Sequence, residues 1–239
     1  MAASEPDERN ARYAIYWAPA GDTALTRIGA PWLGRDATTD RALARPRLAG
    51  FDDAMLTALT ADPRRYGLHA TLKPPFRLAA AASVTALEAE LADFAAATEP
   101  VTLSSIHVTR IGNFLALVPT GPAPSVTALA NACVKHFDRY RAPASDDELV
   151  RRNAAGLTAA QRTNLNRWGY PYVMDEFRFH VTLTGSLDQS VADRLLPALS
   201  QLFADAIAET VVIHDIALFV QHGPGGTFRL VRRFTLADH

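Results

Sequence analysis

The chain has 239 residues, of which 49% are hydrophobic, and its acidic and basic side chains almost cancel at a formal net charge of -1. Such a composition is typical of an ordinary globular protein and excludes a disordered or low-complexity chain. It also argues against a protein of long nucleic acids, because neutralising many phosphates requires a strongly basic surface. We therefore expect one bilobed unit over residues 1–239 and a small anionic ligand.

The single cysteine and the polar N-terminus indicate where the protein works. Cys133 cannot form an internal disulfide, and its helical spacing from Leu129 and Phe137 predicts a core position and not a nucleophile. The first twelve residues are polar and charged, and no stretch approaches the roughly 20 apolar residues that a membrane span requires. We expect a cytoplasmic protein without a membrane partner.

The first half of the chain predicts a β-α-β-β unit at about residues 67–119. Before it, residues 13–18 predict a strand that completes the sheet, residues 19–49 predict loop and short helix, and residues 51–61 predict a short helix. Within the unit we expect a strand at 67–73, a helix at 84–97 and strands at 101–109 and 114–118. The last two strands turn near Gly112-Asn113.

A helical insertion is predicted at about residues 124–172, packed beside the site. It begins with a helix at 125–140. Two capping-box patterns follow, Ser145 with Glu148 and Thr158 with Gln161, and each predicts the start of a further helix. The second of these helices is expected to end near Trp168-Gly169, because glycine suits a helix end and Pro171 prevents continuation.

The last part of the chain, about residues 176–236, repeats the order of the first unit. A strand at 177–184, a helix at 188–208 and strands at 210–221 and 227–236 are expected, with a turn at 223–226. Both units begin with a strand that carries the sequence His-x-Thr-Leu. This shared start aligns the two units and predicts an internally duplicated α+β fold.

The repeated motif is the strongest signal for chemistry. His69 and His180 each open a His-x-Thr-Leu sequence, which chance would place twice in so short a chain only rarely. Alternate strand residues point to the same face, so each predicted strand has an apolar back and a polar front. The front faces would carry two imidazoles, two hydroxyls and two cations, a set suited to holding a phosphate and moving protons: His69, Thr71, Lys73, Arg178, His180 and Thr182.

Other interpretations of these residues lead to different expectations. A metal or cofactor is not expected, because neither motif has an adjacent carboxylate or thiolate pair to complete a ligand set. The remaining five histidines have no repeated context and are expected in surface or core positions. Four aromatic residues near the motifs would contact substrate or simply pack, and both readings stay open: Tyr66, Trp168, Tyr170 and Tyr172.

The paired strands resemble the two-histidine (2H) phosphoesterase superfamily, which includes RNA 2',3'-cyclic phosphodiesterases. Residues 32–36 (WLGRD), 64–76 (RRYGLHATLKPPF) and 166–185 (NRWGYPYVMDEFRFHVTLTG) resemble a branch of domain-of-unknown-function proteins associated with bacterial phosphonate-utilisation operons. The resemblance implies antiparallel sheets facing a central groove. It also implies His69 and His180 as the catalytic pair and Thr71 and Thr182 as phosphate-holding hydroxyls.

The resemblance implies a metal-independent opening of a cyclic phosphate, with one histidine as base and the other as acid. The sequence does not assign the two roles. The operon association favours a small ribosyl 1,2-cyclic phosphate as substrate. Two alternatives remain beside it, an RNA 2',3'-cyclic phosphodiesterase and a non-catalytic phosphate-ligand sensor; nucleic acid is not favoured, since no basic track is visible.

Overall fold

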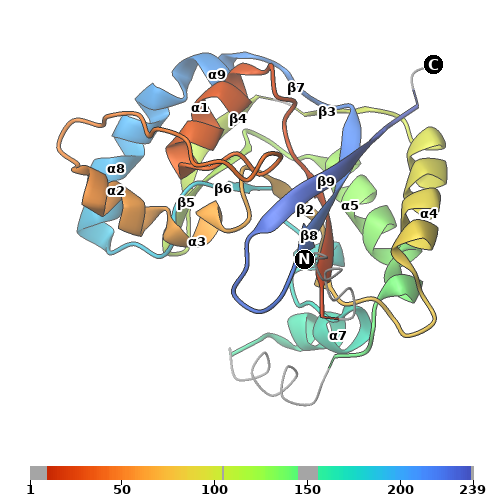
Figure 1. Ribbon diagram of the computed structural model, residues 1–239. Coiled ribbons are helices and arrows are strands. Elements are labelled where there is room, and N and C mark those ends of the chain that lie inside the picture. The colour runs from red at the N-terminus through yellow and green to blue at the C-terminus, as the bar shows by residue number, and fades with distance from the viewer. Residues whose placement is uncertain (1–9, 104, 145–155, 238–239) are drawn as a thin grey trace, which may run out of the picture.

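The protein is an α+β structure built around one large antiparallel sheet, as seen in a computed structural model (Figure 1). The model describes residues 10–103, 105–144 and 156–237. The strands are β1 (Arg12–Trp17), β2 (Ala70–Phe76), β3 (Val101–Leu103), β4 (Ile106–Ile111), β5 (Phe114–Pro119), β6 (Val181–Thr182), β7 (Val211–Ile213), β8 (Asp215–Gln221) and β9 (Phe228–Thr235).

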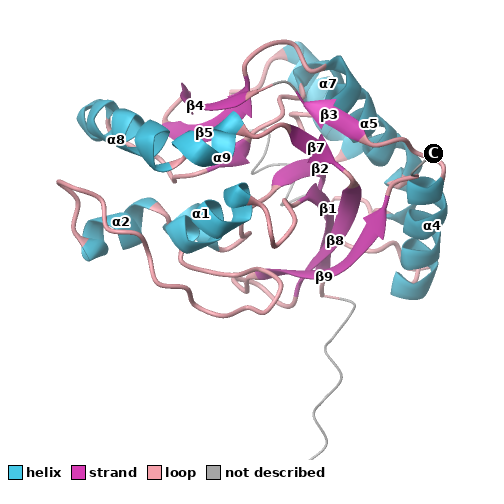
Figure 2. Cartoon of the chain, turned by 90° about the horizontal axis from the view of Figure 1, so that it is seen from above, coloured by secondary structure: helices cyan, strands magenta, loops and turns pink. Residues whose placement is uncertain are grey.

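The helices lie at two ends of the molecule, with the sheet between them (Figure 2). The α-helices are α1 (Ala24–Leu33), α2 (Asp53–Leu59), α3 (Ala61–Arg64), α4 (Val84–Ala96), α5 (Pro124–His136), α7 (Ala159–Trp168), α8 (Gln189–Leu202) and α9 (Ala204–Ala208). Two short 3₁₀ helices are η1 (Asp138–Tyr140) and η2 (Met174–Glu176). Helices α1, α2, α8 and α9 gather at one end, and α4 and α5 at the other. Within the described residues, no helix has the length and apolar character needed to cross a membrane.

The strand order shows how the two halves of the chain combine. Seven strands form one sheet in the order β4-β5-β6-β2-β1-β8-β9, and β3 pairs with β7 in a separate two-stranded sheet. The motif strands β2 and β6 are neighbours, joined by the antiparallel pair Ala70 and Val181. The two repeated units therefore share one continuous sheet, with the two motifs side by side at its centre.

The two faces of this sheet differ. In β1, Tyr13, Ile15 and Trp17 belong to the main core, whereas Ala14 and Tyr16 belong to a small cluster on the opposite face. This is the alternation expected of a strand. Helices α4, α5 and α8 cover the core face, so the opposite face is the one on which the polar motif residues come together.

Most of the expected elements are present with shifted ends. The predicted helix at 84–97 corresponds to α4, while the one at 188–208 is divided into α8 and α9. The predicted strands at 101–109 and 210–221 are likewise divided, into β3 and β4 and into β7 and β8. The strand expected at 177–184 was too long, since β6 has only two residues.

The described part of the insertion carries the predicted capping features. Thr158 caps α7 and forms a reciprocal capping box with Gln161, and Gly169 ends the helix with a left-handed φ of 74°. The pattern of Ser145 with Glu148 lies outside the described residues.

Candidate active site

Both motif histidines line one cavity of about 340 Å³ on the open face of the sheet. Thr71 and Thr182 line it too, so four of the residues that the motifs predicted are together. Although β6 is short, its surroundings keep the predicted alternation: Phe179, Val181 and Leu183 are buried in the core, and His180 and Thr182 face the cavity.

The two imidazoles are held by the same backbone contact. Nδ1 of His69 lies 2.9 Å from the carbonyl oxygen of Gly67, and Nδ1 of His180 lies 2.8 Å from that of Arg178. A carbonyl only accepts, so Nδ1 carries the proton of each neutral ring and Nε2 keeps a free lone pair. Each histidine is thereby prepared to take or give a proton at Nε2.

Gly67 is needed for this arrangement at the first motif. Its φ is +77°, which disfavours any other residue, and a Cβ there would lie 2.5 Å from Cβ of Ala37. The turn brings the Gly67 carbonyl within hydrogen-bond distance of Nδ1 of His69.

Burial lowers the pKa of both histidines. The pKa of His69 falls from 6.5 to about 4, chiefly by burial, with a smaller contribution from a charge on His180. The pKa of His180 is also lowered by burial, against the opposing hydrogen bond to the Arg178 carbonyl. In the empty site both rings are therefore neutral near pH 7.

Aromatic rings make the two histidines unequal. The ring of Tyr16 lies 4.1 Å from that of His69, and the ring of Tyr66 stacks with that of His69 at 5.8 Å. The ring of Phe114 lies 5.8 Å from that of His180. Burial also raises the pKa of the Tyr16 hydroxyl well above 10, so this group remains a neutral donor.

The threonine hydroxyls differ in availability. Thr184 Oγ1 accepts from the Leu115 backbone N–H and donates to the Gly185 carbonyl, which gives it a structural role. The hydroxyls of Thr71 and Thr182 make no hydrogen bond to the described residues. Their hydroxyls are free to donate to a ligand oxygen.

Lys73 is not in the cavity, contrary to the prediction. Thr71 pairs with Tyr16 but Lys73 pairs with Ile15, so the register slips by one residue and turns Lys73 onto the core face. There it is 1% exposed, and Nζ donates to the Val134 carbonyl at 3.2 Å. It is a buried structural cation and not a phosphate ligand.

A second, larger cavity of about 490 Å³ shares the walls Thr71, Pro74, Tyr170 and His180 with the first. Arg178 and Tyr172 line this second cavity, which is mainly aromatic and aliphatic. Its aromatic residues are Phe114, Tyr170, Tyr172 and Phe177.

The four predicted aromatic residues are divided by the structure. Tyr66 and Tyr170 line the histidine cavity, and Tyr170 and Tyr172 line the second one. Trp168 lines neither cavity; the guanidinium of Arg167 lies over its ring at 4.7 Å.

Sequence reasoning missed two residues of β1 that line the histidine cavity, Arg12 and Tyr16. It also gave no role to Trp32 and Arg35 of the WLGRD segment. Trp32 Nε1 donates to the Leu183 carbonyl at 2.8 Å, and the buried Arg35 donates to the carbonyls of Arg64 and Phe228. Trp32 thus contacts the second motif, and Arg35 joins the segment before the first motif to β9.

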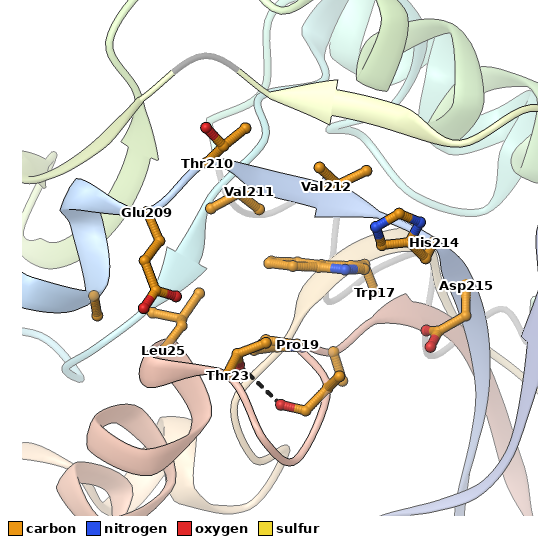
Figure 3. Close-up of a pocket in the computed structure, with 13 residues that line it drawn as sticks. Trp17, Pro19, Thr23, Leu25, Glu209, Thr210, Val211, Val212, His214 and Asp215 are labelled. Atoms are coloured by element: carbon orange, nitrogen blue, oxygen red, sulfur yellow. Dashed lines mark hydrogen bonds between the residues drawn. The ribbon is translucent and has the colours of Figure 1, made fainter.

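A smaller cavity of about 100 Å³ lies apart from the site (Figure 3). Trp17 reaches it because successive β1 residues point to opposite faces, and Glu209, His214 and Asp215 surround the indole. Arg233 donates to both carboxylate oxygens of Asp215, at 2.9 and 3.1 Å. Neither motif histidine takes part.

Among the described residues, no group of three or more histidine, cysteine, aspartate or glutamate side chains is arranged to hold a metal ion. Cys133 is free and buried, and burial raises the pKa of its thiol to about 12. The predicted packing role of Cys133 is confirmed.

Comparison with curated proteins finds relatives that are about twice as long. The chain is 38% identical over 225 residues to ribose 1,5-bisphosphate phosphokinase PhnN of Janthinobacterium sp. (strain Marseille), covering 92% of this chain and 50% of that protein. It is 37% identical over 223 residues to the protein of the same name from Laribacter hongkongensis (strain HLHK9), covering 92% and 51%. The chain thus spans about half the length of these relatives.

Two solved structures align along the chain at low identity. E. coli LigT complexed with 3'-AMP is 13% identical, with a TM-score of 0.43 and coverage of 95% of this chain and 98% of that one. Kluyveromyces marxianus Usb1 is 14% identical, with a TM-score of 0.36 and coverage of 93% and 99%. Both TM-scores lie below 0.5.

A family model described as "Protein of unknown function (DUF1045)" matches residues 71–229, about two thirds of the chain. The match agrees with the expected domain-of-unknown-function branch. The chain belongs to this DUF1045 family.

Proposed function

We propose that this protein is a metal-independent phosphoesterase that opens a small cyclic phosphate by acid–base catalysis between His69 and His180. The observation that carries the proposal is the matched pair of imidazoles in one cavity, each bonded at Nδ1 to the carbonyl two residues before it. Both rings present an unprotonated Nε2, and two free hydroxyls lie beside them. A protein that only senses phosphate would need the hydroxyls and cations. It would not need two imidazoles with Nε2 available for proton transfer.

The reaction needs one neutral ring and one protonated ring. A water molecule gives its proton to Nε2 of the neutral histidine while its oxygen forms a bond to phosphorus. The ester P–O bond to the sugar breaks, and the departing oxygen takes the proton from Nε2 of the charged histidine. Thr71 and Thr182 donate to the non-bridging oxygens, where negative charge is concentrated.

Substrate binding would let one of the two rings take up a proton from solvent. Both rings are neutral in the empty cavity, because burial lowers the pKa of each. An anionic phosphate beside them favours the charged form, so the pKa of one ring rises when the ligand enters. The acid is thus formed only when a substrate is present.

A sugar phosphate is favoured as substrate by the names of the relatives. Ribose 1,5-bisphosphate is a sugar with two phosphates, and the matched half of those proteins covers nearly all of this chain. The kinase activity in that name is not proposed for this chain. Neither of its two lysines, Lys73 and Lys135, follows a glycine, so the Gly-Lys-Ser/Thr phosphate loop of P-loop kinases is not in the sequence.

A second candidate substrate is a nucleoside 2',3'-cyclic phosphate. The aromatic cavity next to His180 favours it, because Phe114, Tyr170 and Tyr172 could stack on a base. A ribosyl 1,2-cyclic phosphate without a base would leave much of this cavity unfilled.

The test compares purified protein and variants on ribose 1,2-cyclic phosphate 5-phosphate, nucleoside 2',3'-cyclic phosphates and cyclic-ended oligoribonucleotides. His69→Ala and His180→Ala should each lower turnover at least about a hundredfold with an unchanged circular dichroism spectrum. His222→Ala is the matched control, since His222 is exposed and lines neither cavity. Full activity in either motif variant would refute the two-histidine mechanism, and higher efficiency on longer oligonucleotides would refute the small substrate.

A further inference from the structure

Strand β1 brings to the histidine cavity two polar side chains that the proposed reaction does not use, Arg12 and Tyr16. They are four residues apart, so strand alternation places both on the face that carries the motif histidines. Their Cα atoms are roughly 13 Å apart along the strand. The Arg12 guanidinium nevertheless lies 5.4 Å from the centre of the Phe228 ring, and the Tyr16 ring lies 6.1 Å from it. The two side chains therefore lean toward each other beside Phe228.

The Tyr16 side chain is almost fully buried, but its hydroxyl has no partner. The residue is 1% exposed, and the hydroxyl makes no hydrogen bond to the described residues. Its oxygen is not among the unpartnered atoms that are sealed from solvent, so it opens into the cavity that Tyr16 lines. The ring packs against the rings of His69 at 4.1 Å and Phe219 at 5.0 Å. A fixed ring thus presents a free O–H donor beside His69.

Arg12 is a cation whose position is also fixed. Its Nε donates to Oε1 of Gln221 at 2.7 Å, and Gln221, which is 2% exposed, donates from Nε2 to the Gly226 carbonyl at 2.6 Å. The bond at Nε leaves the two terminal amino groups for a ligand. Asp62 also lines the cavity, but Arg12 forms no ion pair with the described residues. Among the described residues that line this cavity, Arg12 is the only arginine or lysine.

The motif residues supply no permanent positive charge for a phosphate. Both histidines are neutral in the empty cavity because burial lowers the pKa of each, and Thr71 and Thr182 contribute uncharged hydroxyls. A cyclic phosphate carries one negative charge, and the attack of water concentrates charge on its non-bridging oxygens. Hydrogen bonds to an ionised group are about twice as strong as those between neutral groups. A cation and a further donor would therefore stabilise the reacting phosphate substantially.

We propose that β1 is a third phosphate-binding element of the site: the Tyr16 hydroxyl donates to a non-bridging oxygen of the reacting phosphate, and the Arg12 guanidinium compensates its charge. The inference rests on the proposed function and adds two phosphate-binding residues that lie outside both motifs. It also gives the substrate a direction. A phosphate held from the side of Tyr16 and His69 leaves the sugar to extend toward the second cavity, which His180 lines.

Phosphate binding without turnover provides the first test. Calorimetry with inorganic phosphate should show binding at least about tenfold weaker in Arg12→Met and about fivefold weaker in Tyr16→Phe. Arg12→Lys should restore part of the affinity, since it keeps the charge without the guanidinium geometry. Tyr16→Phe keeps the ring against His69 and removes only the hydroxyl. It therefore keeps the proposal testable if loss of the Gln221 bond unfolds Arg12→Met.

Two matched controls remove the same groups away from the histidine cavity. Arg232→Met removes an arginine that pairs with Glu88 on α4. Tyr140→Phe removes a hydroxyl that donates to the Ala86 carbonyl at 3.1 Å. Neither Arg232 nor Tyr140 lines the cavity, so both variants should bind phosphate like the wild type.

Kinetics then separate this inference from the proposed catalysis. On the preferred cyclic phosphate, Tyr16→Phe should lower kcat/KM at least about fivefold without shifting its pH dependence, because both imidazoles keep their surroundings. If the β1 variants bind phosphate weakly but the wild type opens no cyclic phosphate, the proposed function fails and the β1 site stands. Phosphate binding and kcat/KM that are unchanged in every folded β1 variant would overturn the β1 site, as would a wild type that binds no phosphate.

Discussion

Replacing Lys73 with methionine gives a sharp test of where this side chain lies. Lys73 follows the first motif directly, yet the register slip in β2 places it in the core. Nζ donates to the Val134 carbonyl, lies 3.6 Å from Oδ1 of Asp138 and lies 5.3 Å from the centre of the Phe76 ring. If this placement is right, Lys73→Met should leave kcat/KM within about twofold of the wild type.

The same variant should change stability in a defined direction. Burial lowers the pKa of Lys73 from 10.5 to about 8, and at about 1.36 kcal/mol per unit the buried charge costs about 3 kcal/mol of folding free energy. Methionine removes this cost but also the hydrogen bond to Val134, worth about 1 kcal/mol. Asp138 keeps its partner Arg141. The free energy of unfolding at pH 7 should therefore be unchanged or about 1–2 kcal/mol higher.

The pH dependence of stability provides the decisive assay. Below about pH 8 the lysine is protonated in both the folded and the unfolded state, so the cost is fully present. Between about pH 8 and 10.5 the folded state loses the proton first, and its stability rises. Denaturant unfolding should show that the wild type gains about 2–3 kcal/mol relative to Lys73→Met over this range.

Lys135→Met is the control, since Lys135 is exposed on α5 and should show no such difference from the wild type. A Lys73→Met protein that is stably folded but has lost activity would refute this reasoning. It would place Lys73 at the phosphate after all.

Two further outcomes follow from the histidine cavity. With a cyclic phosphate that lacks a second phosphate, kcat/KM should fall as pH rises above about 6.5, because burial lowers the pKa of both free-enzyme histidines; kcat should persist to higher pH, since a bound anion raises the pKa of one ring. A kcat/KM that is flat from about pH 5 to 9 would contradict the scheme. Exhaustive treatment with chelators should leave the rate unchanged, because no described cluster of three ligand-type side chains is arranged for a metal. Loss of activity that zinc or manganese restores would contradict metal independence.

The sequence predicted the histidine and threonine positions because alternation depends only on local strand geometry. His69 with Thr71, and His180 with Thr182, line one cavity as two-residue spacing requires. The prediction for Lys73 failed because a register slip depends on the partner strand, which spacing within β2 does not reveal. Pro74 and Pro75 were an available signal, since prolines in a strand mark positions where regular pairing breaks down.

The role of Arg12 and Tyr16 could not be found in the same way. Every β1 residue from Tyr13 to Trp17 is buried, and the strand is hydrophobic on both faces. Its sequence therefore does not show which face reaches the site. Only the strand order, which places β1 between β2 and β8, shows that one of its faces reaches the site. That order depends on long-range pairing.

The repeated motifs and strand β1 contribute different parts of the histidine cavity. The two motif segments hold their histidines by the same contact. Under the proposed mechanism, the acid and the base therefore come one from each repeated unit. The residues that make the two ends of the cavity different, Arg12 and Tyr16, come from β1, which belongs to neither unit.

Substitutions in β1 can therefore alter which phosphate ester is bound without moving either imidazole. For the same reason, the two His-x-Thr-Leu motifs bear on the proposed reaction type, whereas Arg12 and Tyr16 bear on which ester the cavity accepts. We expect relatives that keep both motifs but differ at positions 12 and 16 to act on a different phosphate ester.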